Sequence, residues 1–379
     1  MMMHDFQEES METDMGKEIQ GNHSGEAQGA LSRGPAKPYR AIALLSGGLD
    51  SSLAVKMMID QGIAVTAVHF TSPFCNCTSK NAGCKNQAVK VAQEFRVPIR
   101  VIYKGMDYMR MVQNPPHGHG RGMNPCIDCR IFMLKKVKEM MTGSGASFAI
   151  TGEVLGQRPM SQHRAAIQKI EKESELEGRI VRPLSAQHFP PTIPEQEGIV
   201  DRAKLLSFSG RSRKPQIGLA EKLGVKDYPC PAGGCLLTDP VIAARLRDLF
   251  AHVPDYDLAD LHLLKIGRHF RLHPGLKIIL GRNRAENEKI RSLAKSGVIL
   301  FQPAGFRGPT ALACGTVDPL AEQEIGEILA RYSQDDRISY SIQKQISGEK
   351  ESHFSVDRKF DKEALAVLQV DAIDSKRSS

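Results

Sequence analysis

Three groups of residues in this 379-residue sequence have types and spacings that could do chemistry. The first is the run SGGLDSS at residues 46–52, where two glycines free the backbone amides to curl around an anion. The serines add hydroxyl donors, and the aspartate stands where a carboxylate could hold Mg²⁺ between phosphates. A Walker loop would need a lysine, which the run lacks. We predict a phosphate-binding turn, with an ordinary glycine turn capped by Asp50 or Ser51 as the alternative; the candidate ligand residues are Ser46, Gly47, Gly48, Asp50, Ser51 and Ser52.

The second group is a C-x-x-C pair, Cys126 and Cys129, at the expected start of a helix. The helix dipole at such a position tends to lower a thiol pKa and so to favour the reactive thiolate. The pair could be a zinc half-site, a redox pair, two ligands of a cluster, or small buried apolar groups. The preceding loop is rich in His and Gly, which favours a functional site.

The remaining cysteines form a third, looser group. Cys230 and Cys235 lie in a loop of prolines and glycines, and we take Cys235 as the third partner of the C-x-x-C pair. Cys75, Cys77 and Cys84 follow the second expected strand, where zinc or sulfur could be handled, although no fourth ligand stands at a convincing spacing. Cys314 is expected to be a packed core thiol.

The segments around these groups alternate between short apolar runs and helical patterns. We expect strands at residues 41–45, 64–70, 99–103 and 148–151, and helices at 52–59, 88–95 and 131–141. This alternation predicts an α/β fold with a parallel sheet covered by helices. The glycine run then lies between the first strand and the first helix, where helix amides bind phosphate. Residues 152–239 are expected to be mostly irregular.

The length of the chain favours two domains. We predict a disordered tail at 1–38, a catalytic domain at 39–250, a small α+β domain at 255–345 and a polar tail at 346–379. The first 35 residues carry seven acidic and two basic side chains, so the rest has a formal net charge of +13. A strongly basic body is typical of a protein with a polyanion partner, and a basic protein without such a partner is the alternative.

Three observations concern the compartment. No run approaches the roughly 20 apolar residues that cross a bilayer. The N-terminal segment has no apolar stretch typical of a secretory signal. Eight cysteines in such a chain fit metal, redox or catalytic thiols better than a disulfide framework. We therefore expect a cytoplasmic protein with no membrane partner.

The run Ser-Gly-Gly-Leu-Asp-Ser after an apolar strand closely resembles the signature of the PP-loop ATP pyrophosphatases. The resemblance implies that the loop grips the pyrophosphate of ATP while a substrate oxygen attacks the α-phosphate and becomes adenylated. Thr151 and Gly152 would line ATP as a second turn. Over residues 40–250, the runs NPCIDC, GEVLGQRPMSQ and PAGGCLLTDP are similar to tRNA 4-thiouridine synthetases and tRNA 2-thiouridylases.

This second resemblance bears on the cysteines. Related tRNA sulfurtransferases without a sulfur-carrier domain hold an iron-sulfur cluster on three cysteines, which here would be Cys126, Cys129 and Cys235. A 4Fe-4S cluster with three protein ligands leaves one iron open to sulfide. In the competing mechanism, one thiol carries a persulfide and a second resolves it as a disulfide. We recognise no rhodanese-like carrier domain, and therefore favour the cluster.

The C-terminal region, over residues 261–315, resembles the RNA-binding domain of the NFACT proteins, which implies RNA contact by basic side chains beside Phe270. Loop cations upstream suggest a path for a polyanion, with a solvated charged surface as the alternative; they are Arg158, Arg179, Arg182, Arg211, Arg213 and Lys214.

The sequence thus predicts a tRNA sulfurtransferase that adenylates a uridine with ATP and Mg²⁺ and forms 4-thiouridine or 2-thiouridine. Its partners would be tRNA and a sulfide or persulfide donor, and its catalytic residues Asp50, Cys126, Cys129 and Cys235. Two alternatives stay open: a PP-loop ligase or amidotransferase that uses nitrogen, and a non-catalytic RNA-binding factor. Neither the uridine position nor the oligomeric state follows from the sequence.

Overall fold

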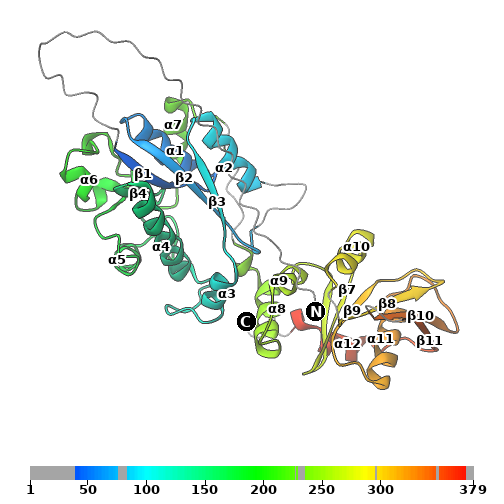
Figure 1. Cartoon of the computed structure of the whole chain (residues 1–379). Coiled ribbons are helices and arrows are strands. Elements are labelled where there is room, and N and C mark those ends of the chain that lie inside the picture. Colours follow the sequence, from blue (N-terminus) through cyan, green and yellow to red (C-terminus); the bar gives the residue numbers. More distant parts are fainter. Residues whose placement is uncertain are drawn as a thin grey trace, which may run out of the picture. The chain divides into compact units, whose positions relative to one another are not determined.

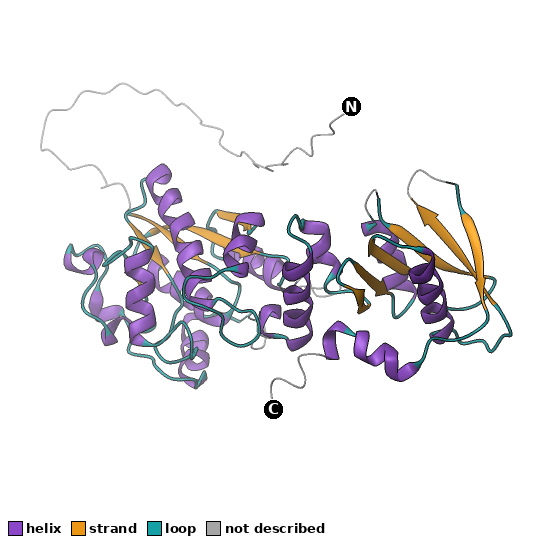
Figure 2. Cartoon of the chain, turned by 90° about the horizontal axis from the view of Figure 1, so that it is seen from below, coloured by secondary structure: helices purple, strands orange, loops and turns teal. Residues whose placement is uncertain are grey.

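A computed structural model describes residues 39–75, 83–226, 228, 235–294, 297–346 and 350–372. The expected tail at 1–38, Cys77, Cys230 and the side chain of Cys84 lie outside this description. Residues 39–372 contain two sheets of different kinds (Figures 1 and 2). None of the described helices is long and apolar enough to span a membrane.

The first sheet is parallel and has the strand order β3-β2-β1-β4-β5. Its strands are β1 (Arg40–Leu44), β2 (Ala64–Thr71), β3 (Ile99–Tyr103), β4 (Phe148–Ile150) and β5 (Ile180–Val181). The central strand β1 pairs on one side with β2, Ala41 opposite Val65, and on the other with β4, Ala41 opposite Phe148. The α/β fold class is confirmed, and the ends of β1 and β4 lie side by side.

Helices cover both faces of this sheet (Figure 1). Ala41 and Ala43 of β1 share an apolar cluster with residues of α1 (Leu49–Ile59), α2 (Gly83–Glu94) and α7 (Lys214–Leu223). The alternate residues Ile42 and Leu44 pack with α4 (Cys126–Ser144) and α5 (Arg164–Glu173). Successive strand side chains point to opposite faces, so burial on both faces requires the continuous apolar run seen in the sequence.

The region that the sequence analysis expected to be irregular contains more structure than predicted. It includes α5, α6 (Ile193–Gln196), α7 and β5, with three-residue 3₁₀ helices at Ala186–His188, Arg202–Lys204 and Leu236–Thr238. These elements are short, and α5 buries only Ala166, Ile167 and Ile170 among its ten residues. Because so few residues of each element are buried and Pro and Gly are frequent between the elements, the apolar periodicity was too weak to predict them. A third cluster joins α3 (Met106–Gln113) to α8 (Pro240–His252) and α9 (Leu258–Leu263).

The second sheet is antiparallel, with the strand order β11-β10-β8-β9-β7-β6. Its strands are β6 (Arg268–His273), β7 (Leu276–Leu280), β8 (Ile299–Ala304), β9 (Ala311–Gly315), β10 (Tyr340–Ile346) and β11 (Ser352–Val356). On one face, α11 (Pro319–Arg331) and α12 (Lys362–Leu368) pack over Ile278 and Leu280. On the other, α10 (Arg284–Leu293) buries Ile290 against Ile279 and Leu312. The predicted α+β character of this region is confirmed.

The expectation of a polar tail from residue 346 was wrong for residues 350–372. Strand β11 pairs with β10, Ile342 opposite Phe354, and Leu365 of α12 is buried in the core of the second sheet. An edge strand and a two-turn helix need few apolar side chains, so this segment has the composition of a tail. The boundary between the two predicted domains stays a prediction.

Candidate active site

The predicted phosphate turn lies between β1 and α1, as the strand-turn-helix pattern requires. Gly47 has a φ of 78°, a conformation that glycine adopts without strain. The Ser46 and Ser51 hydroxyls lie 3.0 Å apart, and those of Ser51 and Ser52 donate to the Gly48 carbonyl at 2.9 and 3.1 Å. These hydroxyls therefore shape the turn, while the first-turn amides of α1 have no intrahelical acceptor and could bind an anion.

The second predicted turn, at Thr151 and Gly152, directly follows β4 and contacts the phosphate turn. A Cβ atom on Gly152 would lie 2.5 Å from the backbone carbon and oxygen of Asp50 and from the amide nitrogen of Ser51. Real Cβ atoms do not approach backbone so closely, so only glycine fits. The two turns, which are far apart in the chain, therefore lie in direct contact.

Asp50 has the environment expected of a cation ligand. Gln157 Nε2 donates to its Oδ2 at 3.1 Å, whereas the buried Oδ1 has no hydrogen-bond partner. Burial raises the pKa of Asp50, and the neighbouring Gln157, Arg213 and Arg158 offset only part of that rise. A bound cation would favour the charged carboxylate and satisfy the free oxygen, so the residues present fit Mg²⁺ with a nucleotide phosphate.

Backbone hydrogen bonds hold together the three loops that carry thiols. Leu236 N donates to the Phe74 carbonyl at 3.2 Å, which ties the residue after Cys235 to the residue before Cys75. Met123 N donates to the Leu237 carbonyl at 2.8 Å and brings in the loop before Cys126. Gly122, with a φ of 70°, lies so close that a Cβ atom there would be 2.4 Å from Leu237 O. Cys75, which the sequence analysis kept apart, thus belongs to the same region as the C-x-x-C pair.

Lys104 and Tyr108 complete this region, and the sequence analysis missed both. The Lys104 side chain is 8% exposed, its Nζ lying 3.4 Å from Cys129 Sγ and 4.1 Å from the centroid of the Tyr108 ring. The Tyr108 hydroxyl lies 3.6 Å from the same sulfur. Lys104 directly follows β3, at the edge of the sheet where ligands bind, and this position was the available signal.

The expected lowering of the thiol pKa by the helix dipole was wrong for Cys126. Burial raises the pKa of Cys126, and the charge of Cys129 raises it further, although Arg158 and the amide of Asn124 act against this. Burial also raises the pKa of Cys235 to about 11. At these partly buried positions the loss of hydration outweighs the dipole, since a buried thiolate needs a specific cation.

Two arginines connect the thiols to the nucleotide turns. The charge of Arg158 lowers the pKa of both Asp50 and Cys126, and therefore lies near both. Arg130, the residue after Cys129, pairs with Glu153 at 3.3 Å, next to Gly152. Glu153 also pairs with Arg182 at 3.0 Å, and Arg182 is 4% exposed and bonded to Glu171 as well. Arg182 is therefore a structural cation, and its assignment to a polyanion path was wrong.

The predicted cluster ligands pass one of two tests of fit. Cys126, Cys129 and Cys235 supply the thiol donors that iron-sulfur clusters use. Burial is the main cause of the raised pKa of Tyr108, and the charges of Cys129, Cys235 and Cys75 raise this pKa further, so these three thiols lie near one another around the ring. Among the described residues, however, no three His, Cys, Asp or Glu side chains are close enough to hold a metal ion. The donors are neighbours and not a formed ligand set.

The predicted RNA contact beside Phe270 was wrong for Phe270 itself and for Arg271. Phe270 is fully buried in the core of the second sheet, and its neighbour His269 is buried as well. Arg271 and Lys277 both pair with Asp248, at 2.8 and 2.7 Å. The mixture of basic and apolar residues along β6 was taken for an exposed RNA-binding surface, but His269 and Phe270 of this strand are buried. Other arginines of this region line a groove: Arg268 at the start of β6, and four more on α10 and in the loops beside it.

Comparisons with known proteins support the two sequence resemblances. Residues 38–204 match the family model described as Thiamine biosynthesis protein (ThiI), and residues 267–366 match that of the NFACT protein RNA binding domain. A probable tRNA sulfurtransferase of Methanosarcina mazei is 29% identical over 31% of this chain and 29% of its own length. One from Thermoanaerobacter sp. strain X514 is 32% identical over 31% and 30%, and the tRNA-specific 2-thiouridylase MnmA of Leptospira interrogans is 23% identical over 30% and 36%. The chain thus spans about a third of the length of these relatives.

Solved structures match more weakly. A crystal structure of a 4-thiouridine synthetase–RNA complex with bound ATP is 22% identical, with a TM-score of 0.32 over 49% of this chain and 52% of that chain. The U34-tRNA thiolase NcsA from Methanococcus maripaludis with its 4Fe-4S cluster is 15% identical, with a TM-score of 0.30 over 60% and 71%. Such scores carry no argument about function.

Proposed function

The chain joins a ThiI-like PP-loop domain to an NFACT RNA-binding domain, and on this basis we propose that it is an ATP-dependent tRNA sulfurtransferase of the cytoplasm. It would adenylate a uridine oxygen of tRNA and replace that oxygen with sulfur, forming 4-thiouridine or 2-thiouridine. The ThiI-like match supports ATP as the activating substrate, and the NFACT match supports RNA as the acceptor.

One observation carries this proposal: the thiols and the phosphate turn share their neighbours. Arg158 acts on both Asp50 and Cys126, and Arg130, beside Cys129, pairs with Glu153 of the second turn. A PP-loop enzyme that used nitrogen would have no need of a thiol group beside its nucleotide. Sulfur chemistry needs the two together, because the adenylated base must meet sulfur before water hydrolyses it.

The residues divide the reaction between them. The amides of the 46–52 turn would hold the pyrophosphate portion of ATP, and Asp50 a Mg²⁺ ion beside it. The uridine oxygen attacks the α-phosphorus, pyrophosphate leaves, and the base then carries AMP as a good leaving group. Arg158 lies where a cation can stabilise the negative charge that develops between nucleotide and thiols. Sulfur then bonds to the base carbon and AMP departs with the former uridine oxygen.

The thiols would supply that sulfur. Lys104 and the Tyr108 hydroxyl, 3.4 and 3.6 Å from Cys129 Sγ, orient this sulfur and keep it from bulk water. Cys126, Cys129 and Cys235 would also be the residues to hold a 4Fe-4S cluster, which when bound would offer an open iron for sulfide. In the other route, a persulfide donor leaves its outer sulfur on one of these thiols, and this outer sulfur bonds to the base carbon as AMP departs. A second thiol then attacks the inner sulfur, so that the two thiols form a disulfide and the thiolated base is released.

The proposal is tested with anaerobically purified protein, unmodified tRNA and MgATP, with either sulfide or a persulfide donor as the source of sulfur. Released AMP and thiolated nucleosides are measured together by liquid chromatography and mass spectrometry. Wild type should form both; Asp50→Asn should form neither, and Cys129→Ser should lose the thiolated nucleoside. Cys314→Ser, a thiol on β9 of the second sheet, is the matched control and should behave as wild type.

The two alternatives give different results. Full activity of Cys126→Ala with nitrogen incorporated into RNA would replace the proposal by an amidotransferase or ligase. Normal cellular function of Asp50→Ala would indicate a non-catalytic RNA-binding factor. Iron content and the visible absorbance of a cluster in active protein decide the sulfur route, since an iron-free and colourless enzyme that is active with the persulfide donor and not with sulfide requires the persulfide.

A further inference from the structure

The second sheet carries a groove within the residues that match the NFACT RNA-binding domain. It has a volume of about 830 Å³ and lies between α10, the start of β6 and the loop after β8. We call it the arginine groove, because five guanidinium groups line it: Arg268, Arg282, Arg284, Arg291 and Arg307. Two aromatic side chains, Phe306 and Tyr332, line it as well.

Much of the positive charge in the groove is not neutralised. Arg282 and Arg284 pair with glutamates one turn further along α10, Glu286 and Glu288. Arg291 donates only to neutral groups, Gln302 Oε1 at 2.8 Å and Thr310 Oγ1 at 2.9 Å. Within the described part of the chain, no carboxylate pairs with the side chains of Arg268, Arg291 or Arg307. Three uncompensated guanidinium groups in one groove favour an anion with several charged oxygens.

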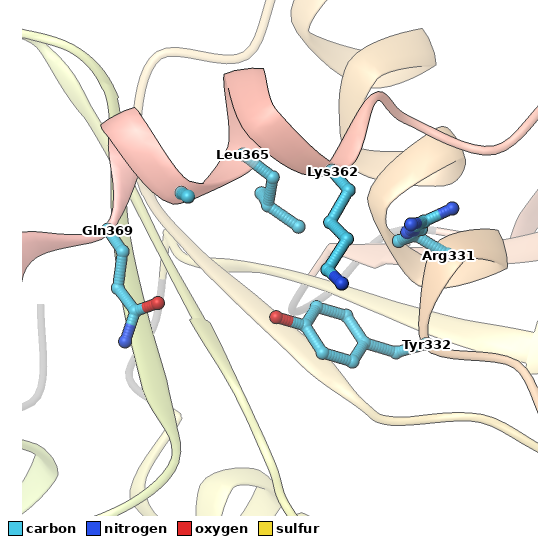
Figure 3. A pocket seen from close by; sticks show the side chains of 6 residues that line it. Arg331, Tyr332, Lys362, Leu365 and Gln369 are labelled. Atoms are coloured by element: carbon cyan, nitrogen blue, oxygen red, sulfur yellow. The ribbon is translucent and has the colours of Figure 1, made fainter. Parts of the chain in front are cut away.

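Tyr332 links this groove to a second pocket. The smaller pocket, of about 250 Å³, is lined by Tyr332 together with Arg331, Lys362, Leu365, Ala366 and Gln369. Figure 3 shows Lys362 of α12 reaching toward the Tyr332 ring, with Arg331 beside it. Arg268 stacks over the same ring, 4.8 Å from its centroid. Several cations therefore lie around one half-buried aromatic ring.

An alternation of cationic groups and aromatic rings is what an unpaired nucleic-acid strand requires. Its phosphates pair with arginine and lysine, and its exposed bases stack on aromatic faces or guanidinium planes. The groove has the volume of a small-ligand site, so it accepts individual nucleotides. A duplex keeps its bases inside the stack and presents a wide backbone surface, which would leave the rings without a partner.

We propose that the arginine groove and the smaller pocket bind successive nucleotides of a single-stranded RNA segment. A base would pack against Tyr332 and Phe306, with phosphates on Arg291 and Arg307 on one side and on Arg331 and Lys362 on the other. The proposal rests on the proposed function for RNA as the class of polyanion. It adds that the second sheet grips an unpaired region of tRNA, and does not read its helical stems.

The test measures binding of fluorescent RNA to the full chain by anisotropy, for a single-stranded oligonucleotide and for a blunt hairpin of equal length. We expect the single strand to bind more tightly. Arg307→Gln and Arg291→Gln should each weaken it and reduce the slope of log affinity against log salt by about 0.7. Tyr332→Leu should weaken it about 5- to 150-fold, since a base loses its stacking partner. Lys289→Gln, an exposed cation of α10 outside the groove, is the matched control.

Several results would overturn the inference. Equal or tighter binding of the hairpin removes the single-strand preference, and unchanged affinity and salt slope of Arg291→Gln and Arg307→Gln remove the site. If inorganic phosphate displaces RNA at the concentration at which phosphate itself binds the protein, the groove is a phosphate site and not an RNA site. Thermal unfolding confirms that each variant is folded, and Arg291→Lys should restore part of the affinity. If the groove substitutions weaken RNA binding but the wild-type protein does not thiolate tRNA, the proposed function is refuted and this inference stands.

Discussion

The substitution Gly152→Ala tests whether the two turns form one nucleotide site. The added methyl group would lie 2.5 Å from three backbone atoms of Asp50 and Ser51. Backbone has no rotamer by which to escape, so the phosphate turn or the second turn must shift. Overpacking of this kind typically costs about 1–3 kcal/mol. In a domain of this size the melting temperature then falls by roughly 2–4 °C for each kcal/mol.

The larger effect should be on ATP. If the shift breaks one amide-to-phosphate hydrogen bond, worth about 1.5–3 kcal/mol, the affinity for ATP falls by roughly 10- to 150-fold. Isothermal titration calorimetry with MgATP measures this loss. Gly143→Ala is the matched control, because Gly143 lies in α4 with nothing within 4 Å of its Cβ position, and alanine should stabilise that helix slightly. Wild-type melting temperature and ATP affinity in Gly152→Ala would refute the close approach of the two turns.

Three further substitutions address other parts of the account. Gly122→Ala places a Cβ atom 2.4 Å from Leu237 O, so it should separate the thiol loops and abolish thiolation while calorimetry finds normal ATP binding; normal thiolation would contradict the loop arrangement. Burial pushes the pKa of Glu153 up, but Arg130 and Arg182 outweigh it and hold the pKa below 4.5. Its contribution to stability is therefore complete above pH 4.5 and lost as the pH falls through the folded-state pKa, so Glu153→Gln should flatten the acid side of a plot of melting temperature against pH. Phe270→Ala should lower the stability by about 3–5 kcal/mol in denaturant titration, and a purely RNA-binding defect in a fully stable variant would show that Phe270 faces a ligand.

The parallel sheet and the phosphate turn could be predicted from the sequence because their signals are local. A strand buried on both faces has to be a continuous apolar run, as in β1, and a glycine turn before a helix is marked by its own residues. The position of Gly152 against Asp50 was implied only by family resemblance, because no local pattern records which distant segments touch. The short helices after β4 were missed for a different reason, because each buries too few residues to give a clear periodicity.

The thiol region shows where local reasoning ends. Lys104, Tyr108 and Cys75 reach Cys129 and Cys235 through the pairing of separate loops, which spacing along the chain does not encode. The sign of the Cys126 pKa shift was predicted from the helix dipole, but burial decides it and depends on the whole fold. In the second sheet, Arg271 and Lys277 pair with Asp248, while the arginines that line the groove come from β6, α10 and two loops.

The central claim is that this chain places sulfur on a tRNA uridine, and tRNA nucleosides from a deletion strain test it most directly. Mass spectrometry should find one thiolated uridine absent from the deletion strain and restored by the wild-type gene, but not by Asp50→Asn or Cys129→Ser. A deletion strain with an unchanged profile of thiolated nucleosides would contradict the account.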